Sequence, residues 1–203
     1  PNGIDTQVFC PSRRENPSSL FGIPLDGKLV IGVIGRISIE KRPSMLLDIV
    51  SRMNAKGLDV VGLFIGDGSQ RSEMEELVER NRQNNVIKFV GIRDDMDRVY
   101  RALDLVVHFC DVEGFGLTHA EALASGTPIV AAKGGAASEL IIDGENGYLV
   151  DINDSESFAR QSHALLTNSN LRRQFRISGL KIIKDYFSLD RYVTNNENLY
   201  EMI

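Results

Sequence analysis

Short apolar runs rich in β-branched residues recur along the chain and alternate with longer segments of helical period. The runs occupy residues 29–35, 60–66, 86–91, 105–110, 128–132 and 147–150. They are apolar almost throughout, as strands must be when helices cover both faces of a sheet, whereas a strand with one wet face would alternate. The pattern therefore predicts a parallel sheet of about six strands.

The segments between the runs carry apolar residues at the spacing of a helix. In the first, Leu46, Ile49 and Met53 share one face, and Pro43 suits the first turn. Segments 70–82, 95–103, 117–125 and 136–142 follow the same period. Alternating strands and helices indicate a doubly wound, Rossmann-like α/β fold, whose ligands bind at the carboxyl ends of the strands. The binding site is therefore expected in the loops near residues 36, 67, 92, 113 and 134.

After Val150 the helical period continues without further strands. Helices are expected at about 155–167, 170–187 and 189–202, with Ser188 as a cap for the last one. No repeat, low-complexity tract or linker rich in Pro, Gly or Ser divides the chain. We therefore expect residues 1–203 to form one domain with a C-terminal helical tail.

Composition narrows the class of protein. Of the 203 residues, 42% are hydrophobic, enough for a sizeable core, and 28 Asp and Glu outnumber 23 Lys and Arg. The resulting net charge of −5 disfavours nucleic acid as a partner. Two distant cysteines, Cys10 and Cys110, have no metal-ligand spacing and fit a reduced, cytoplasmic setting. No apolar run reaches the roughly 18 residues of a membrane span.

The segment EGFGLTHAEALASG (113–126) carries the strongest candidate chemistry. Gly114 and Gly116 leave the backbone open at the head of a predicted helix, so that neighbouring amides can face a phosphate or sugar hydroxyls. Glu113 and Glu121 would flank such a ligand and accept hydrogen bonds from its hydroxyls. An alternative is open for Glu121, because its spacing from Thr118 is that of a capping box; in isolation, the cap is the favoured interpretation.

Two cations follow the first predicted strand. Arg36 and Lys41 lie just ahead of a helix N-terminus, a place suited to anions, where they could clamp a diphosphate. Exposure as ordinary surface residues is an equally good interpretation. The stretch GDGSQR (66–71) also follows a strand but lacks the third glycine of a dinucleotide motif, and a tight turn explains it as well. The glycine pair that opens GGAASELI (134–141) likewise suits a tight turn into a helix.

The histidines are weaker candidates. His108, His119 and His163 have no metal-ligand spacing. His108 lies in an apolar run, which predicts a core histidine whose hydrogen bonds are satisfied. The order of residues supports no Ser-His-Asp or Cys-His arrangement.

Five segments together resemble a known family. In order and spacing, they are similar to the C-terminal half of a retaining glycosyltransferase of GT-B architecture, family 4. The segments are PNGID (1–5), GRISIEK (35–41), IGDG (65–68), EGFGLTHAEALASGTPIVA (113–131) and GGAASELI (134–141). The resemblance covers nearly the whole chain. Its most specific part is the pair of glutamates separated by seven residues, the second of which opens E-A-L-A-x-G-x-P.

In that family the C-terminal domain holds a nucleotide-diphosphate sugar, so the resemblance implies roles for particular residues. Arg36 and Lys41 would hold the diphosphate and, with Glu113, form the catalytic group. Glu113 would contact the hydroxyls of the donor sugar, and Glu121 would contact the ribose. The resemblance implies no metal or other cofactor, because the two cations and the helix dipole stabilise the leaving diphosphate.

The resemblance places further residues around the donor. They are Gly66, Gly68, Ile92, Arg93, Phe115, Gly116 and Leu117. The amides of residues 115–117 would meet the sugar and the phosphates. The base would lie against the loop that carries Ile92 and Arg93, with the two glycines close by.

One residue and the length of the chain depart from the family pattern. Arg42 stands where the family usually has glycine. In the family, PNGID lies at the crossover after an N-terminal domain, so residues 1–10 would be the crossover segment and residues 189–203 the helix that crosses back. The chain thus resembles half an enzyme. The missing N-terminal domain would recognise an acceptor sugar, lipid or small molecule and would supply any peripheral contact with a membrane.

The sequence therefore predicts the donor-binding half of a hexosyltransferase that uses a UDP- or GDP-sugar and an unknown acceptor, and that is inactive as an isolated chain. Two alternatives remain open. One is a nucleotide-sugar-binding module without catalysis. The other is a sugar-nucleotide epimerase of related architecture, although those enzymes lack this glutamate-rich segment in this form.

Overall fold

Six parallel strands form one sheet, as the sequence predicts. The computed structural model describes residues 3–201, apart from the side chains of residues 195, 196 and 198–201. The strands are β1 Leu29–Ile34, β2 Val60–Ile65, β3 Ile87–Gly91, β4 Leu105–His108, β5 Ile129–Ala132 and β6 Tyr148–Val150. Their order is β3-β2-β1-β4-β5-β6, which reverses between β1 and β4 as in a doubly wound, Rossmann-like sheet.

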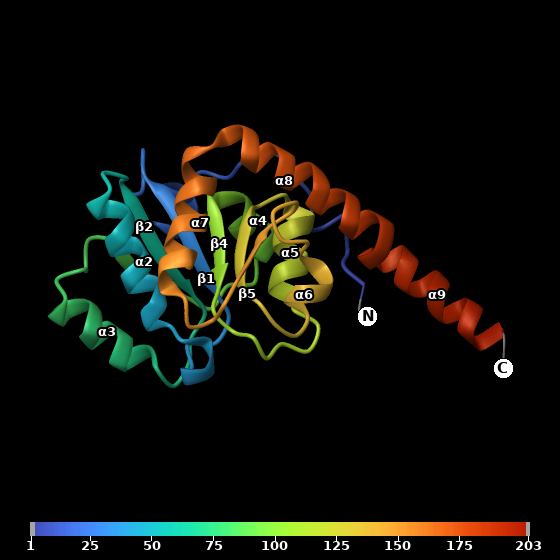
Figure 1. The fold of residues 1–203 in the computed structure, drawn as a ribbon, viewed down its shortest axis with the longest axis horizontal. Helices are drawn as coiled ribbons and strands as arrows, with labels where there is room; N and C mark the ends of the chain where they lie inside the picture. The colour runs from blue at the N-terminus through green and yellow to red at the C-terminus, as the bar shows by residue number, and fades with distance from the viewer. Residues whose placement is uncertain (1–2, 202–203) are drawn as a thin grey trace.

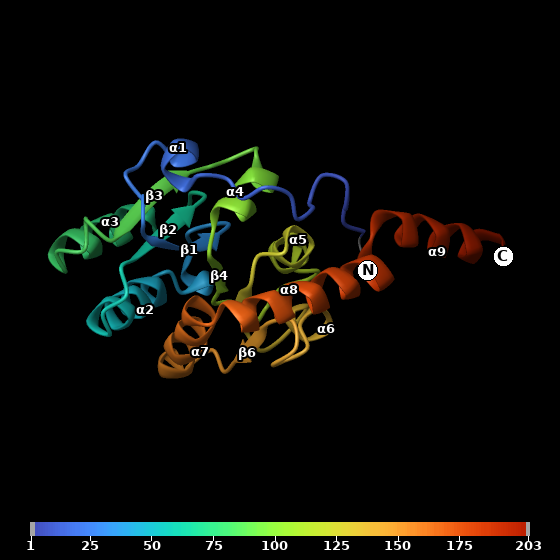
Figure 2. The same ribbon diagram turned by 90° about the horizontal axis from the view of Figure 1, so that it is seen from above.

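Helices cover both faces of the sheet. On one face lie α2 (Ser44–Ala55), α3 (Arg71–Arg80) and α7 (Ser155–Thr167). On the other lie α1 (Pro17–Phe21), α4 (Met96–Ala102), α5 (Leu117–Ser125) and α6 (Ala137–Leu140). Figure 2 shows α2 and α7 on the opposite side of the sheet from α1 and α4. The short α1 and a 3₁₀ turn, Ile39–Lys41, lie in segments for which the sequence predicted no helix.

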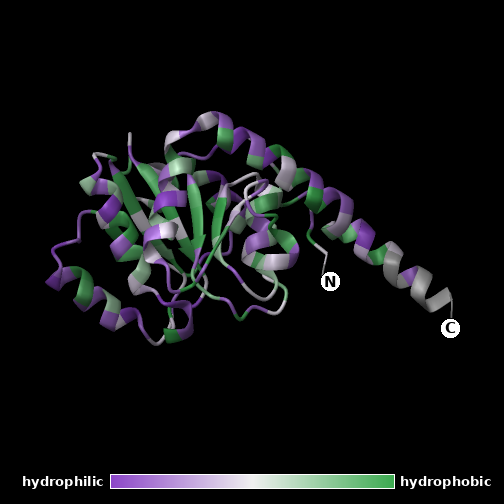
Figure 3. Cartoon of the chain, in the orientation of Figure 1, coloured by the Kyte–Doolittle hydropathy of each residue, from purple (hydrophilic) through white to green (hydrophobic). Residues whose placement is uncertain are grey.

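The strands divide their side chains between two apolar layers. Along β1, Val30 and Ile34 face the layer under α4 and α5, whereas Ile31 faces the layer under α2 and α7. Every residue of β2, β4 and β5 is buried. Figure 3 shows the hydrophobic colour concentrated in the strands and the hydrophilic colour on the outer helices. Burial on both faces explains why the strands are apolar almost throughout.

The C-terminal helices pack across the domain and then leave it. Helix α8 (Ser169–Ile182) packs on α5 and α7, continues through a π-helical turn (Ile183–Phe187) and is followed by α9 (Leu189–Glu201). The single helix predicted at 170–187 is thus regular only in its first part. Figure 1 shows α9 projecting from the body of the domain.

The start of α9 is tied to the N-terminal segment. Ile4 N donates to Phe187 O at 2.8 Å, and Leu189 N donates to Ile4 O at 2.9 Å. The predicted cap is a long contact, with Ser188 Oγ 3.4 Å from the amide of Arg191. Two apolar side chains of α9, those of Tyr192 and Val193, are 40% and 45% exposed. The side chains of Leu199 and Tyr200, further along α9, lie outside the part of the chain whose side chains the structure describes.

Arg42 keeps the turn that a glycine would be expected to make. It follows the 3₁₀ turn with φ 43°, in the left-handed region. For a residue with a side chain this conformation costs about 1 kcal/mol. Its guanidinium Nη1 donates to Ile152 O at 3.2 Å and to Asn153 Oδ1 at 2.9 Å. These contacts oppose the backbone cost, so the loop between β1 and α2 is held without glycine.

Candidate functional site

The reversal of strand order brings two loops together at one edge of the sheet. Residues 35–43 follow β1 and residues 109–116 follow β4, and these strands are parallel neighbours. A crevice is expected at such a switch point. A pocket of about 340 Å³ lies there, lined by Ile34, Gly35, Arg36, Lys41, Glu113, Phe115, Gly116, Leu117 and Thr118. We call it the donor-side pocket, and it brings together six of the predicted site residues.

Helix α5 begins in the wall of the donor-side pocket without a side-chain cap. Gly116 precedes the helix with φ 75°, and a Cβ at this position would lie 2.3 Å from His119 Nδ1, so glycine is required. Among the described residues, the amides of Phe115, Gly116 and Leu117 have no hydrogen-bond partner. They are free to bind an anion or a hydroxyl, and the helix dipole favours negative charge at this end.

Lys41 and Glu113 meet inside the pocket. Their side chains, 17% and 24% exposed, form an ion pair between the loops after β1 and β4. His108, the last residue of β4, joins them, with Nε2 3.2 Å from Glu113 Oε1 and 3.4 Å from Lys41 Nζ. Burial lowers the pKa of the Lys41 ammonium, an effect that the Glu40 carboxylate partly opposes. The Lys41–Glu113 pair thus places one positive and one negative group in the pocket that is also lined by the residues with free amides.

His108 is buried, as predicted, but only one of its two ring nitrogens has a hydrogen-bond partner among the described residues. Its ring stacks edge-on against His119, with centroids 4.4 Å apart, and its Nδ1 has no partner among the described residues. Both ring nitrogens of His119 are also without a partner there. Burial is the first cause that lowers the pKa of His108 to about 2 and that of His119 to about 4. Both rings are therefore neutral at physiological pH, and the charge beside them is that of Lys41. The sequence feature that could have indicated a site role for His108 is its position at the carboxyl end of a strand, β4.

Arg36 lines the same pocket but reaches into solvent. Its side chain is 80% exposed, and its Nη2 lies 4.0 Å from Oε1 of Glu40, four residues along the chain. The structure thus separates the two predicted cations. Lys41 is held in the pocket by Glu113, whereas the Arg36 side chain lies exposed at its rim.

The capping-box interpretation of Glu121 is wrong. Helix α5 begins at Leu117, so Thr118 is its second residue and Glu121 lies beyond the first turn. Glu121 Oε2 instead accepts a hydrogen bond from the hydroxyl of Tyr100, at 2.8 Å. Burial raises the pKa of the Glu121 carboxyl, and this hydrogen bond partly opposes the shift. The sequence did not predict Tyr100 as a partner, because it lies on a different helix, α4.

Four predicted residues lie at the same edge of the sheet but outside the lining of the donor-side pocket. A Cβ on Gly66 would lie 2.1 Å from Gly35 O, and one on Gly68 would lie 2.4 Å from Ile37 O. These two glycines therefore let the loop after β2 pack against the loop after β1. Ile92 is 81% exposed, and the guanidinium of Arg93 is engaged with Asp95 through hydrogen bonds of 2.8 and 2.6 Å.

The glycine pair at 134–135 supports the loop that carries Glu113. Gly134 and Gly135 have φ 150° and 43°, and their added Cβ atoms would lie 2.7 Å from Asp111 O and Glu113 O, respectively. Ala136 N donates to Glu113 O at 3.2 Å. The tight turn predicted for this segment thus packs against the backbone of the catalytic candidate Glu113 and holds it in place.

Two searches over the described residues bear on metals and membranes. No three His, Cys, Asp or Glu side chains gather there in a way that could hold a metal ion. No helix in that part of the chain is long and apolar enough to cross a membrane. Cys10 and Cys110 are free thiols.

Comparison with known proteins places this geometry in a family. Residues 20–181 match the family model described as glycosyl transferases group 1. D-inositol 3-phosphate glycosyltransferase of Mycolicibacterium smegmatis is 34% identical over 160 residues, which are 77% of this chain and 37% of that enzyme. The chain thus spans well under half the length of this relative.

Two solved structures agree in fold. The C-terminal domain of LpcC, a glycosyl transferase group 1 family protein of Francisella tularensis, is 32% identical with a TM-score of 0.79, and the match covers 92% of this chain and 100% of that domain. HepE of Anabaena, solved in complex with UDP and glucose, is 27% identical with a TM-score of 0.86, and the match covers 99% of this chain and 55% of HepE.

The doubly wound sheet, the pocket at its switch point and these matches agree with one another. This chain therefore belongs to the glycosyl transferases group 1 family and has the fold of the C-terminal domain of a GT-B glycosyltransferase.

Proposed function

We propose that this chain is the donor-binding half of a retaining glycosyltransferase that moves a hexose from a UDP- or GDP-sugar to an acceptor. The observation that carries the proposal is the donor-side pocket, where Lys41, Glu113 and the free amides at the head of α5 line one space. Such a site offers cationic, anionic and neutral hydrogen-bonding groups within one ligand's length. The complex of HepE with UDP and glucose supports UDP as the first nucleotide to test.

In this proposal Lys41 and the head of α5 hold the diphosphate. The ammonium of Lys41 is largely buried, so its attraction for phosphate oxygens is less screened than that of an exposed lysine. The amides of residues 115–117 and the α5 dipole act in the same direction. As the bond to the sugar breaks, negative charge grows on the diphosphate, and these preorganised groups stabilise it. Arg36, which is exposed, adds a second cation from the rim.

The two glutamates bind different parts of the donor. Glu113 lines the donor-side pocket and accepts hydrogen bonds from the sugar hydroxyls, which orients the anomeric carbon. Glu121 lies one turn into α5, where its free carboxylate oxygen accepts from the ribose while Tyr100 holds the other. The base lies against the loop after β3, near Ile92 and Arg93. We propose no metal or cofactor, since cations and amides neutralise the diphosphate.

In this proposal, transfer of the sugar requires a second domain in addition to the one described. Acceptor recognition and the closure that excludes water come from a second, N-terminal domain. The support is that the matches cover 37% of the D-inositol 3-phosphate enzyme and 55% of HepE. The 203-residue chain should then bind a donor and transfer nothing.

Calorimetry of the chain against UDP, GDP, UDP-glucose and the matching GDP-sugar tests donor binding directly. We expect saturable binding of one nucleotide series. The Lys41→Ala variant should bind that series more weakly, and Lys56→Ala, at the far end of α2, is the matched control for loss of a lysine. A folded chain that binds none of the four ligands, or that loses binding equally in both variants, contradicts the proposal.

A further inference from the structure

A second pocket lies at the opposite edge of the sheet. Its walls come from the amino ends of β4 and β5, the turn after α5 and the start of α8, and its volume is about 280 Å³. Asp104 precedes β4 and Pro128 precedes β5, so the whole length of these strands separates this pocket from the donor-side pocket. We call it the arginine pocket. Nothing in the proposed donor chemistry uses it.

The arginine pocket is strongly basic in an acidic chain. The five basic residues that line it are Arg14, Arg101, Arg172, Arg173 and Arg176. Among the described residues of its lining, Asp104 is the one carboxylate. In the whole chain, by contrast, 28 acidic residues outnumber 23 basic ones. A hollow with this local excess of positive charge attracts anions.

Three of the arginines have structural partners but keep free donors. Arg14 Nη1 donates to Asp104 at 2.6 Å, and Arg101 pairs with Asp97 at 2.9 Å. Arg172 Nη1 donates to two carbonyls at the end of α7, at 2.5 and 2.7 Å. A guanidinium carries five N–H donors, so the single nitrogen used by Arg14 and by Arg172 leaves most of each group available.

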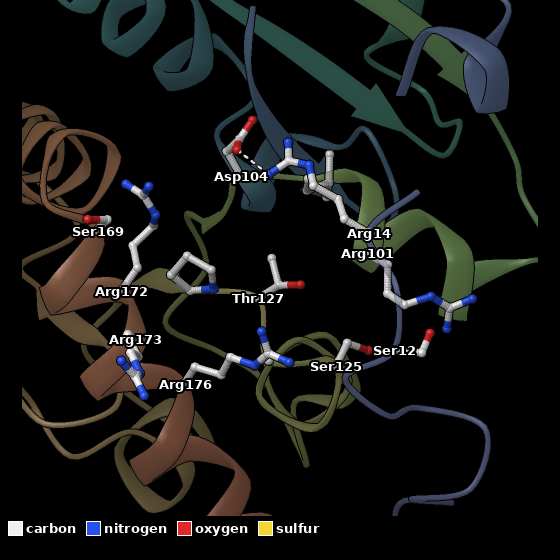
Figure 4. A pocket seen from close by; sticks show the side chains of 13 residues that line it. Ser12, Arg14, Arg101, Asp104, Ser125, Thr127, Ser169, Arg172, Arg173 and Arg176 are labelled. Atoms are coloured by element: carbon white, nitrogen blue, oxygen red, sulfur yellow. Dashed lines mark hydrogen bonds and ion pairs between the residues drawn. The ribbon is translucent and has the colours of Figure 1, made fainter. Parts of the chain in front are cut away.

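The other two arginines lack such partners among the described residues. Arg173 and Arg176 are exposed on α8 and form no ion pair or side-chain hydrogen bond with any described residue. Arg176 lies over the turn after α5, with Nε 2.9 Å from the place where Gly126 would carry a Cβ. Figure 4 shows Arg14 above and Arg176 below the space in front of Thr127.

Hydroxyl groups complete the lining. Ser125 is 5% exposed, and its Oγ is buried with no hydrogen-bond partner among the described residues. A buried hydroxyl without a partner costs free energy unless a ligand satisfies it. Ser169 is the first residue of α8, a helix of 14 residues, so the pocket also receives the positive end of that helix dipole.

We propose that the arginine pocket binds a phosphomonoester group. The guanidinium fork pairs with two phosphate oxygens at once, and a tetrahedral dianion can accept from donors on several sides. The pocket offers such donors from the N-terminal segment, the end of α5 and the start of α8. Its small volume suits one phosphate group rather than a polymer. The proposal does not depend on donor binding at the other edge.

An NMR titration of the isotope-labelled chain with inorganic phosphate, at constant ionic strength, tests this site. We expect saturable shifts of the amide signals of Gly126, Thr127 and Ser169, and much weaker shifts with acetate. Arg176→Gln should weaken phosphate binding at these signals about tenfold, as loss of a charge-assisted contact does. Because Arg176 is exposed, the variant should fold, and the unchanged remainder of its spectrum shows that.

Two variants provide matched controls. Arg80→Gln removes an exposed, unpaired helix arginine on α3 and should leave phosphate binding unchanged. Lys41→Ala should leave the phosphate-induced shifts of Gly126, Thr127 and Ser169 unchanged, because Lys41 belongs to the donor-side pocket and any loss of phosphate binding should be confined there. Shifts confined to the donor-side pocket and abolished by Lys41→Ala would refute the inference, as would equal phosphate affinity in the parent and Arg176→Gln chains.

The phosphate chemistry has two sources, a free phosphomonoester and the headgroup of phosphatidic acid. Cosedimentation with phosphatidylcholine vesicles, with and without phosphatidic acid, distinguishes them. Binding that requires phosphatidic acid and is lost in Arg176→Gln assigns the pocket to the lipid. Absence of vesicle binding, with phosphate binding retained in solution, assigns it to a soluble ligand. Vesicle binding that is equal in parent and variant counts against the pocket.

Discussion

Lys41, in the loop after β1, forms an ion pair with Glu113, in the loop after β4. The two loops meet because the strand order reverses between these strands. In the pair, each charge is the other's nearest partner, so an incoming diphosphate must compete with the Glu113 carboxylate for the ammonium. A sugar hydroxyl can in turn donate to the carboxylate. In the proposed function, the pair is therefore already positioned for a ligand that carries both a diphosphate and sugar hydroxyls.

The first prediction concerns the two cations. Lys41→Ala should weaken nucleoside-diphosphate binding by about 1.5–3 kcal/mol, since a charge-assisted contact in a largely buried place is lost. Arg36→Ala should cost less, about 0.5 kcal/mol, because its side chain is 80% exposed and its charge is screened. Calorimetry with the nucleotide that binds checks both values. Equal losses in the two variants would show that exposure does not decide their roles.

The second prediction concerns Glu113. Glu113→Gln removes the carboxylate that competes for Lys41, so affinity for the free nucleoside diphosphate should stay at the parental value or rise. The added affinity of the intact nucleotide-sugar should disappear, because the hydroxyl acceptor is weakened. Calorimetry with the nucleotide and the nucleotide-sugar, on parent and variant, gives the comparison. A variant that still prefers the nucleotide-sugar as the parent does places the sugar elsewhere.

The third prediction separates the structural and ligand roles of Glu121. Tyr100→Phe removes the hydrogen bond to Glu121 but keeps the carboxylate, whereas Glu121→Gln keeps an acceptor for Tyr100 but loses the charge. If Glu121 binds the ribose, Glu121→Gln should lower nucleotide affinity by roughly 1–3 kcal/mol with little change in Tm. Tyr100→Phe should lower Tm more than affinity, since Tyr100 is fully buried. The reverse pattern would make Glu121 a purely structural residue.

The fourth prediction concerns pH. Burial lowers the pKa of His108 to about 2 and that of His119 to about 4. An unfolded histidine has a pKa of about 6.5, so below that pH the unfolded chain binds more protons and stability falls as pH falls. The loss should be on the order of 2 kcal/mol per ring between pH 6.5 and pH 5.

Urea unfolding across this pH range measures the loss. His119→Leu should remove part of the dependence, because one titrating ring is gone. His163→Gln, on helix α7 and away from both rings, is the control and should retain the full dependence. Identical pH profiles for the parent and His119→Leu chains would mean that the buried pair does not control acid sensitivity.

The fifth prediction concerns Arg42. Arg42→Ala loses the hydrogen bonds to Ile152 and Asn153 while keeping the left-handed backbone, so it should destabilise the fold by about 1–2 kcal/mol. Arg42→Gly loses the same bonds but relieves a backbone cost of about 1 kcal/mol. We therefore expect the glycine variant to melt at the higher temperature of the two. The opposite order of Tm would show that φ 43° carries no strain here.

The elements of this fold follow from local patterns. The residues of β2 are apolar in sequence because both faces of the strand are covered, and α5 begins and ends at residues 117 and 125 as its period and flanking glycines predict. Helix boundaries, strand runs and glycine turns depend on side chains within a few residues. Most of these elements can therefore be predicted from the sequence, although the short α1, the 3₁₀ turn and the π-helical end of α8 were not. The edge of the sheet that holds the site follows from the parallel strands.

The partners of the site residues depend on contacts that are distant in the chain. Capping-box spacing pointed to Thr118 for Glu121, but the helix starts at Leu117 and the partner is Tyr100, on α4. His108 was expected to be a satisfied core residue, yet packing of β4 beside β1 sets it against Lys41. Periodicity records which face of an element is buried and carries no information about which neighbour covers it. Strand order and helix packing decide that, because they alone bring residues far apart in sequence to hydrogen-bonding distance.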